Sequence, residues 1–300
     1  MRALYRDALR LKKCAKSVSS YIPCDILVMY GMGASDRHQV ALDHVAGGGI
    51  LLTFDIGYWG RNPAGVYRKY RVSINGMHPP KFIMLGEDPG PRRWRQAKLE
   101  IIQSGNPDGP ILLVGNGPKS NSAGANGWAA KTSRELRKVF PHKKVVYKPK
   151  PGRQNDPGVL SDSVTIANID DVLTDISLVV CRHSNVAVDA CRMGVPVVCE
   201  DGAAAAIYPQ TLKTRHQQPD LSTRAEFLRR LAWWQWSPHE VGGGEFWTWM
   251  DKILDAGLLD TLSPCSDRQL SDFRESVENL RPIRQKLQQV GHRRTSRGRP

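Results

Sequence analysis

The stretch from residue 163 to residue 202 constrains the fold most, because it holds a helical segment with one short apolar run before it and another after it. The apolar runs are Leu178–Cys181 and Val195–Cys199, and the helical segment is Asn185–Met193. Strands buried on both faces of a parallel sheet read as continuous apolar runs. Gly194 fits the end of the helix, and Pro196 cannot extend it. The stretch therefore predicts a strand, a polar turn, a helix and a second, parallel strand.

The polar turn in this stretch is the first candidate for a binding site. It reads Arg182-His183-Ser184-Asn185 and directly follows a predicted strand. Open α/β sheets bind ligands beyond the carboxyl ends of their strands. A helix N-terminus at that edge offers free N–H groups and a partial positive charge, which suit a pyrophosphate. The alternative is an ordinary strand–helix–strand unit in which Ser184 or Asn185 only caps the helix.

Strand and helix patterns alternate through most of the chain, which predicts an α/β fold. Further strands are expected at 25–30, 50–54, 67–74, 111–115, 145–147 and 164–167, and helices at 36–45, 128–140 and 170–174. Glycine, proline and aspartate cluster at 86–109 around a basic helix, which marks a boundary between two domains. Two later helices, 224–236 and 238–254, carry aromatic stripes. Their tryptophans are assigned to packing: Trp233, Trp234, Trp236, Trp247 and Trp249.

The net charge of +14 favours a polyanionic partner, such as nucleic acid or a phosphate-rich substrate, although a solvated basic surface would give the same balance. The six cysteines are scattered without a CxxC pair, which predicts reduced, buried thiols rather than a disulfide framework or a zinc site. No apolar run is long enough to span a membrane, and the N-terminus lacks a signal-peptide core, so we expect a cytoplasmic protein. The motifs GxxxxGKS/T, GxGxxG, HExxH and GxSxG are absent, which argues against P-loop, zincin and serine-hydrolase chemistry.

The second half of the chain resembles the donor-binding domain of GT-B glycosyltransferases. The resemblance covers about residues 110–210 and is carried by IDDVLTDISLVVCRHSNVAVDACRMGVPVVCED, with a GNGPKSN loop and a KPKPGR loop before it. It implies two Rossmann-like α/β domains that face each other across a cleft. The expected acceptor-binding domain is 1–105, the nucleotide-sugar-binding domain is 106–260, and 261–300 forms a helical crossover and a basic flexible tail.

The N-terminal half carries a second resemblance. FDIGYWGR is similar to a segment of some capsule-polysaccharide glycosyltransferases, and its combination with SINGMHP and LAWWQWS resembles phage-encoded glycosyltransferases that modify DNA bases. These resemblances imply sugar transfer to a hydroxyl acceptor. A hydroxymethylated base in double-stranded phage DNA is favoured, which would place the protein in the host cytoplasm. The alternatives are a capsule or envelope glycan as acceptor, and a non-catalytic nucleic-acid-binding protein.

The resemblance also implies a nucleotide-sugar co-substrate, with a UDP-sugar favoured, and neither a tightly bound cofactor nor a metal. The departing pyrophosphate needs N–H groups, lysine, arginine or a metal to stabilise its charge. No DxD motif is present, and Asp170-Asp171 reads as a helix start. Suitable groups follow the predicted strands and form the expected donor-binding set: Asn116, Gly117, Lys119, Ser120, Lys148, Arg153, Ile169, His183, Ser184, Asn185, Glu200 and Asp201.

An inverting transfer needs a base that takes the proton of the acceptor hydroxyl. Asp55 is the favoured base, since it ends an apolar strand and precedes Gly57 and aromatic residues that would partly desolvate it. The other interpretation of Asp55 is a structural aspartate bonded to loop N–H groups. The alternative base is His78, whose loop lies between Asn75-Gly76 and two prolines.

Residues expected to contact the acceptor combine aromatic rings with cations. The acceptor or DNA set is Tyr58, Trp59, Arg61, Arg92, Arg93 and Arg95. The arginine-rich C-terminal tail, RRTSRGRP, would add contacts to phosphates, or it is only a solvated tail.

Overall fold

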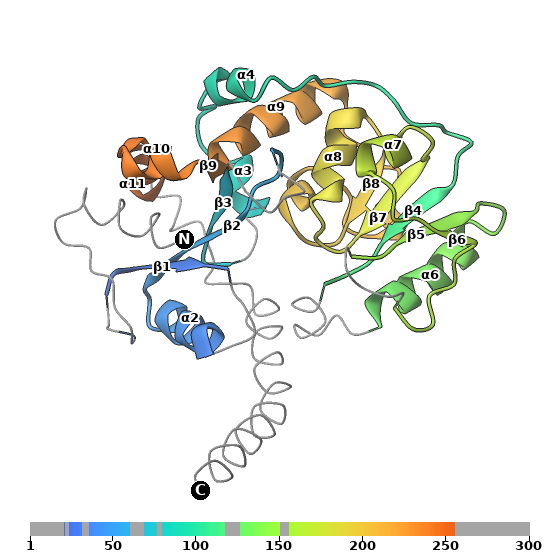
Figure 1. Ribbon diagram of the computed structural model, residues 1–300, viewed down its shortest axis with the longest axis horizontal. Coiled ribbons are helices and arrows are strands. Elements are labelled where there is room, and N and C mark those ends of the chain that lie inside the picture. The colour runs from blue at the N-terminus through green and yellow to red at the C-terminus, as the bar shows by residue number, and fades with distance from the viewer. Residues whose placement is uncertain are drawn as a thin grey trace, which may run out of the picture.

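The computed structural model describes residues 21, 24–31, 36–60, 69–76, 80–117, 127–150 and 156–255. Within them the chain forms two sheets, a four-stranded sheet in the N-terminal part and a five-stranded sheet in the second half (Figure 1). Helices lie against both sheets, so the predicted α/β class is confirmed. The predicted crossover and tail, 261–300, lie outside the described residues.

The second sheet is fully parallel. Its strands are β4 (Ile111–Val114), β5 (Val145–Lys148), β6 (Ser163–Val164), β7 (Leu178–Cys181) and β8 (Val197–Cys199). Its helices are α6 (Trp128–Val139), α7 (Ile169–Leu173) and α8 (Val186–Met193). The strand order is β6-β5-β4-β7-β8, a doubly wound order whose direction reverses between β4 and β7. The predicted strand, turn, helix and strand of residues 178–199 are confirmed as β7, α8 and β8.

The first sheet is mixed rather than parallel. Its strands are β1 (Ile26–Tyr30), β2 (Ile50–Ile56), β3 (Tyr70–Ile74) and β9 (Gln235–Trp236), in the order β1-β2-β3-β9. Only β1 and β2 are parallel, joined through α2 (Asp36–Ala46), while β3 is antiparallel to both of its neighbours. A parallel pair needs a long crossover, usually a helix, and no helix is predicted between β2 and β3. The expectation of a Rossmann-like first domain is therefore wrong beyond its first strand pair.

The chain after residue 231 returns to the first sheet. The predicted helix at 224–236 is α9 (Leu221–Leu231), whose Asp220 cap accepts the Thr223 N–H at 2.7 Å, followed by η4 (Ala232–Trp234) and β9. Pairing of β9 with β3 overrides the helical pattern at its end. The predicted helix at 238–254 is split at Gly243-Gly244 into α10 (Pro238–Gly242) and α11 (Glu245–Asp255). Residues 235–236 thus pair with the first sheet, although the predicted domain 106–260 includes them.

One continuous apolar core joins the two sheets. It contains Phe54 of β2 and Val179 of β7, together with aromatic residues of the C-terminal helices. Phe54 packs edge-on against Phe246 of α11, with ring centroids 5.2 Å apart. Helix α9 contacts α8 on one side and α3 (Pro80–Ile83) and α4 (Arg92–Ala97) on the other (Figure 1). The five tryptophans assigned to packing all belong to this core or pack against it, which confirms that assignment.

Three of the four described cysteines are buried, as predicted, and the prediction is wrong for the fourth. Cys181, Cys191 and Cys199 are buried free thiols, whereas Cys24 is exposed. Cys181 and Cys199 face each other across β7 and β8, with their Sγ atoms 3.7 Å apart. Within the described ranges, no three His, Cys, Asp or Glu side chains gather as metal ligands. None of the described helices has the length and apolar character needed to cross a membrane.

Candidate active site

The site lies at the carboxyl edge of the second sheet, where the strand order reverses. Strand β4 runs into Asn116 and Gly117, and its neighbour β7 runs into the turn that contains His183. Because β4 and β7 are parallel, both segments leave the sheet at the same edge. Lys150 follows β5 at this edge, and a Cβ added at Gly117 would lie 3.7 Å from its Cε. The structure therefore brings predicted donor-binding residues together with Lys150, which the prediction missed.

The turn between β7 and α8 presents the helix N-terminus at this edge. Asn185 is the N-cap of α8, and its carbonyl oxygen accepts the N–H groups of Val188 at 2.9 Å and Asp189 at 3.2 Å. The Ser184 Oγ accepts the N–H of Val186 at 3.3 Å. The predicted cap is therefore present only in part, because Ser184 bonds the first helical N–H while the Asn185 side chain makes no cap bond.

His183 is surrounded by cations. Burial, together with the smaller effects of the charges of Arg182, Arg71 and Lys150, lowers the pKa of His183 to about 3. The imidazole is therefore neutral at neutral pH, while three fixed positive charges converge near it. Two of the three cations have carboxylate partners, Arg71 with Asp55 and Arg182 with Glu200, and a group of cations at a sheet edge suits a pyrophosphate.

The His183 imidazole makes stability depend on pH. Its pKa is near 6.5 in the unfolded chain and about 3 in the folded chain, so the unfolded chain binds the extra proton between these values. The stability that the neutral His183 imidazole gives to the folded chain is fully present above pH 6.5 and is lost as pH falls toward 3. Because the ring is partly exposed, we expect His183→Gln to reduce the acid-side loss at pH 5 by roughly 1 kcal/mol. Urea unfolding at pH 7 and pH 5 measures this loss of free energy, and His142→Gln, at an exposed histidine, is the control that should leave it unchanged. If His183→Gln loses as much free energy of unfolding between pH 7 and pH 5 as the wild type, the prediction is wrong.

The remaining described donor candidates lie around the same edge but already have protein partners. Glu200 accepts the Trp128 Nε1–H at 2.6 Å and faces Arg182, with 3.9 Å between its Oε1 and the arginine Nε. Asp201 accepts the N–H of Gly202 at 2.6 Å. Lys148 donates from Nζ to the Ala167 carbonyl, and burial lowers the pKa of Lys148. These bonds shape the edge of the site and compete with any ligand for the same groups.

Two predicted features of α7 have simple structural roles. Ile169 is the first residue of α7, and its half-buried side chain packs against the main core. Asp170 and Asp171 lie in the first turn of α7, which confirms the helix-start interpretation. Asp170 also pairs with Arg192 of α8, with 2.8 Å between Oδ1 and NH2.

Asp55 lies opposite this edge and is linked to it through Arg71. On the first sheet, Asp55 of β2 pairs in register with Arg71 of β3, and their Oδ2 and NH2 atoms are 3.2 Å apart. The NH1 group of Arg71 donates to the Asn185 Oδ1 at 3.3 Å, and the Asn185 Nδ2 donates to the Gly57 carbonyl at 3.3 Å. The predicted base and the predicted donor turn therefore share one site, joined by residues of both sheets.

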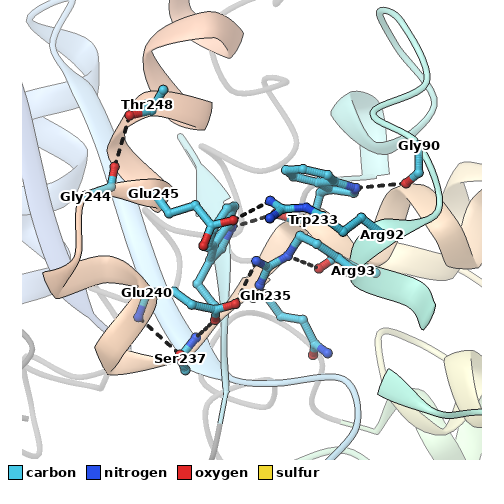
Figure 2. Close-up of polar contacts among 12 residues, drawn as sticks. Gly90, Arg92, Arg93, Trp233, Gln235, Ser237, Glu240, Gly244, Glu245 and Thr248 are labelled. Carbon is cyan, nitrogen blue, oxygen red and sulfur yellow. Dashed lines mark hydrogen bonds and ion pairs between the residues drawn. The ribbon is translucent and has the colours of Figure 1, made fainter. Parts of the chain in front are cut away.

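The Gly57-Tyr58 loop is held from behind by β9. The Tyr58 N–H donates to the Gln235 Oε1 at 2.8 Å, and Gln235 is fully buried. Arg93 of α4 fixes β9 in turn, because its NH2 donates to the Gln235 carbonyl at 2.6 Å and its Nε to the Ala232 carbonyl at 3.1 Å (Figure 2). Its NH1 also pairs with the Glu240 Oε1 at 2.8 Å. Arg93 thus anchors the loop that carries the first-sheet half of the site.

Two predicted acceptor contacts need correction for this reason. Tyr58 is 0 % exposed and Arg93 is 1 % exposed, so neither side chain reaches an acceptor. Burial raises the pKa of Tyr58, and its ring lies 6.0 Å from the Arg71 guanidinium carbon. Both residues are supports of the site rather than contacts for DNA. Sequence patterns miss this, because a basic helix and an aromatic residue after a strand look the same whether they are buried or exposed.

The other acceptor candidates are mostly paired or packed. Arg92 forms an ion pair with Glu245 and lies 5.3 Å from the centre of the Trp233 ring (Figure 2). Trp59 is half-buried and packs edge-on against Trp94 at 5.6 Å, and Arg95 is exposed. Five predicted site residues lie outside the described residues: Arg61, His78, Lys119, Ser120 and Arg153.

Some buried polar atoms near Asp55 and the sheet edge have no hydrogen-bond partner among the described residues. They include Tyr58 Oη, Trp59 Nε1, Asn116 Nδ2 and Gln235 Nε2. A buried polar group without a partner costs roughly 1–3 kcal/mol, so native proteins keep few of them. Asn116 is one of the predicted donor-binding residues, and its position at the sheet edge suits a bond to a ligand.

Gly202 keeps the His183 turn in place, and enlarging it should impair binding at the site. Its φ is +97°, and an added Cβ would lie 3.0 Å from the His183 Cα. We expect Gly202→Ala to weaken nucleotide binding about tenfold or more by displacing His183. Gly48→Ala is the matched control, since Gly48 has a φ of +86° and open space around it. Isothermal titration calorimetry with UDP compares them, and equal affinities in the two variants contradict the prediction.

Comparison with known proteins gives distant structural matches only. No family model and no curated protein matches the chain. A Thermosulfurimonas dismutans KpsC structure described as a beta Kdo 2,7 transferase is similar at 17% identity and a TM-score of 0.41, over 67% of this chain and 78% of that one. A KpsC beta Kdo 2,4 transferase from the same organism is similar at 12% identity and a TM-score of 0.44, over 69% and 79%. Both names denote glycosyltransferases, the predicted class, but the function proposed below rests on this chain's own residues.

Proposed function

We propose that the protein is a glycosyltransferase of GT-B type that transfers a sugar from a nucleotide-sugar to a hydroxyl acceptor. The donor is expected to bind at the carboxyl edge of the second sheet, with its pyrophosphate near the first turn of α8. Asp55 then faces the transferred sugar from the first sheet and takes the proton of the acceptor hydroxyl in an inverting displacement. A UDP-sugar is the favoured donor, and the proposal uses no metal, because cations and N–H groups are present for the leaving charge.

A single observation supports this function best. Arg71 contacts Asp55 and Asn185 at once, so a carboxylate that can act as a base meets the donor edge of a doubly wound sheet. Ligands of such sheets bind where the strand order reverses, and here that point lies between Asn116 and His183. A binding protein for nucleotides would need the sheet edge but would have no use for an aspartate across from it.

The first test is binding and turnover of nucleotide-sugars. Titration calorimetry with UDP and a panel of nucleotide-sugars, including an activated Kdo donor, should show saturable binding by the full chain. We expect Lys150→Ala to weaken that binding about tenfold, since Lys150 contributes one of the converging charges. Lys213→Ala, an exposed lysine of η3 (Leu212–Thr214), is the control. Absence of binding to every nucleotide and nucleotide-sugar would sink the proposal.

Two acceptor classes follow from different observations. The net charge of +14 favours DNA, with a hydroxymethylated base as the nucleophile. Against DNA, two of the three arginines predicted on α4 have glutamate partners, Arg92 with Glu245 and Arg93 with Glu240. Paired cations release fewer counterions on binding DNA, so this neutralisation favours the second candidate, a capsule or envelope glycan, as the acceptor.

The acceptor test compares the two classes directly. The protein and the donor that binds are incubated with hydroxymethylated duplex DNA and with oligosaccharides, and products are read by nucleoside and glycan mass spectrometry. A DNA acceptor predicts a steep salt dependence that weakens when residues 291–300 are deleted. Salt-independent transfer to an oligosaccharide selects the second candidate. Duplex affinity without any product from any donor would instead identify a non-catalytic nucleic-acid-binding protein.

A further inference from the structure

Arg71 forms hydrogen bonds to both halves of the proposed site, and no sequence pattern predicted a role for it. It lies on β3, directly opposite Asp55 of β2 in the antiparallel register. Its side chain is only 8 % exposed. One guanidinium nitrogen contacts the Asp55 carboxylate and another contacts the Asn185 amide, at 3.2 Å and 3.3 Å. The residue therefore connects two positions that are 130 residues apart, 55 and 185.

The chemistry of the guanidinium fits this position better than that of an ammonium group. A guanidinium is planar and donates from three separate nitrogens in a fixed fork, whereas lysine has a single nitrogen. Here NH2 serves the carboxylate and NH1 serves the amide, so the two acceptors are held at a fixed mutual distance and angle. A lysine at position 71 could keep the charge but could not reproduce the fork.

The partner on the donor side is itself fixed. The Asn185 amide accepts from Arg71 through Oδ1 and donates to the Gly57 carbonyl through Nδ2, so each end of the amide has a partner of matching type. The backbone carbonyl of Asn185 accepts the Val188 and Asp189 N–H groups in the first turn of α8. A shift of that turn is therefore transmitted through Asn185 and Arg71 to Asp55.

We infer that Arg71 is a positioning residue that fixes the Asp55 carboxylate relative to the donor bound at the first turn of α8. This inference rests on the proposed function, because it assigns Arg71 to the same reaction. Arg71 acts through Asp55 and Asn185 and not on the sugar itself. Misplacing a reacting group by about 1 Å costs on the order of a hundredfold in rate, while binding of the donor changes little. Loss of Arg71 should therefore appear in kcat rather than in the KM for the donor.

The test compares substitutions of two buried arginines. Arg71→Lys and Arg71→Ala are measured for kcat and donor KM, by transfer or by release of UDP from the donor. Arg224→Lys is the matched control, since Arg224 is also buried and hydrogen-bonded, to the Cys191 and Ile102 carbonyls and to Gln103, away from the site. We expect Arg71→Lys to lower kcat about a hundredfold with donor KM within about threefold, and Arg224→Lys to keep kcat while lowering the melting temperature.

Chemical rescue separates positioning from folding. Millimolar guanidinium should restore activity of Arg71→Ala at least several-fold, because it fills the space of the lost fork, and it should not raise the activity of Arg224→Lys. Wild-type kcat in Arg71→Lys, or a loss in proportion to unfolded protein as in the control, would overturn the role of Arg71 alone. A wild-type protein that neither binds nor turns over any nucleotide-sugar would overturn the proposed function, and this inference with it.

Discussion

Asp55→Asn is expected to abolish sugar transfer while nucleotide binding stays intact. The amide is nearly the same size as the carboxylate, so the local fold should survive, but its one oxygen can accept from the Arg71 NH2 or from the Ile56 N–H and not from both, as Asp55 does. It cannot take a proton at neutral pH, and loss of a general base costs about 10²–10⁴-fold in rate. Steady-state turnover and calorimetry with UDP, on the same preparation, measure the two effects.

Another ion-paired aspartate provides the control for this substitution. Asp170 pairs with Arg192 at 2.8 Å, much as Asp55 pairs with Arg71 at 3.2 Å, but it lies on α7, outside the proposed site. Asp170→Asn should therefore leave turnover unchanged. If Asp55→Asn keeps full activity, Asp55 is not the base, and His78, the alternative predicted from the sequence, becomes the next residue to test.

Arg93→Ala is expected to destabilise the fold by about 3–5 kcal/mol, because it leaves a glutamate of a buried ion pair without its partner. Three bonds are lost at once, to Glu240 and to the carbonyls of Gln235 and Ala232 (Figure 2). The guanidinium carbon of Arg93 also lies 3.6 Å from the centre of the Trp236 ring, so the substitution removes a cation–π contact as well. Urea unfolding, monitored by tryptophan fluorescence, measures the change.

Its neighbour Arg92 is the matched control on the same helix. Arg92 is 56 % exposed and pairs with Glu245 at the surface, so Arg92→Ala should cost less than about 1 kcal/mol. Similar losses in the two variants would contradict the anchoring role of Arg93. Because Gln235 also holds the Tyr58 N–H, Arg93→Ala should reduce turnover at temperatures where most of the protein is still folded.

The local sequence patterns predicted the second sheet well. The apolar runs that became β7 and β8, and the glycine that ends α8 at a φ of +77°, depend on residues close together in the chain. In a parallel sheet, the segment after each strand necessarily reaches the same edge. For that reason Asn116 and His183 could be assigned to one edge from the sequence, although the cation cluster around His183 could not.

The patterns failed where the chain crosses between sheets. Residues 235–236 continue a helical pattern, yet they form β9, because pairing with β3 gives their backbone groups partners that an isolated segment lacks. Arg93 reads as a surface cation, yet it is buried under β9. The local pattern of apolar residues could not predict either outcome, because both depend on contacts between elements that are more than a hundred residues apart.

The sequence by itself determined the parallel second sheet, the edge at which we propose that the donor binds, and Asp55 as a carboxylate at the end of a strand. Only the tertiary structure decided what faces that edge. The Arg71–Asn185 bond joins residues 114 positions apart, and the bond from Tyr58 to Gln235 spans 177. Periodicity describes which face of an element is apolar, but it does not say which element will cover that face. The roles of Arg71, Gln235 and Arg93 depend on contacts between segments that are far apart in the sequence.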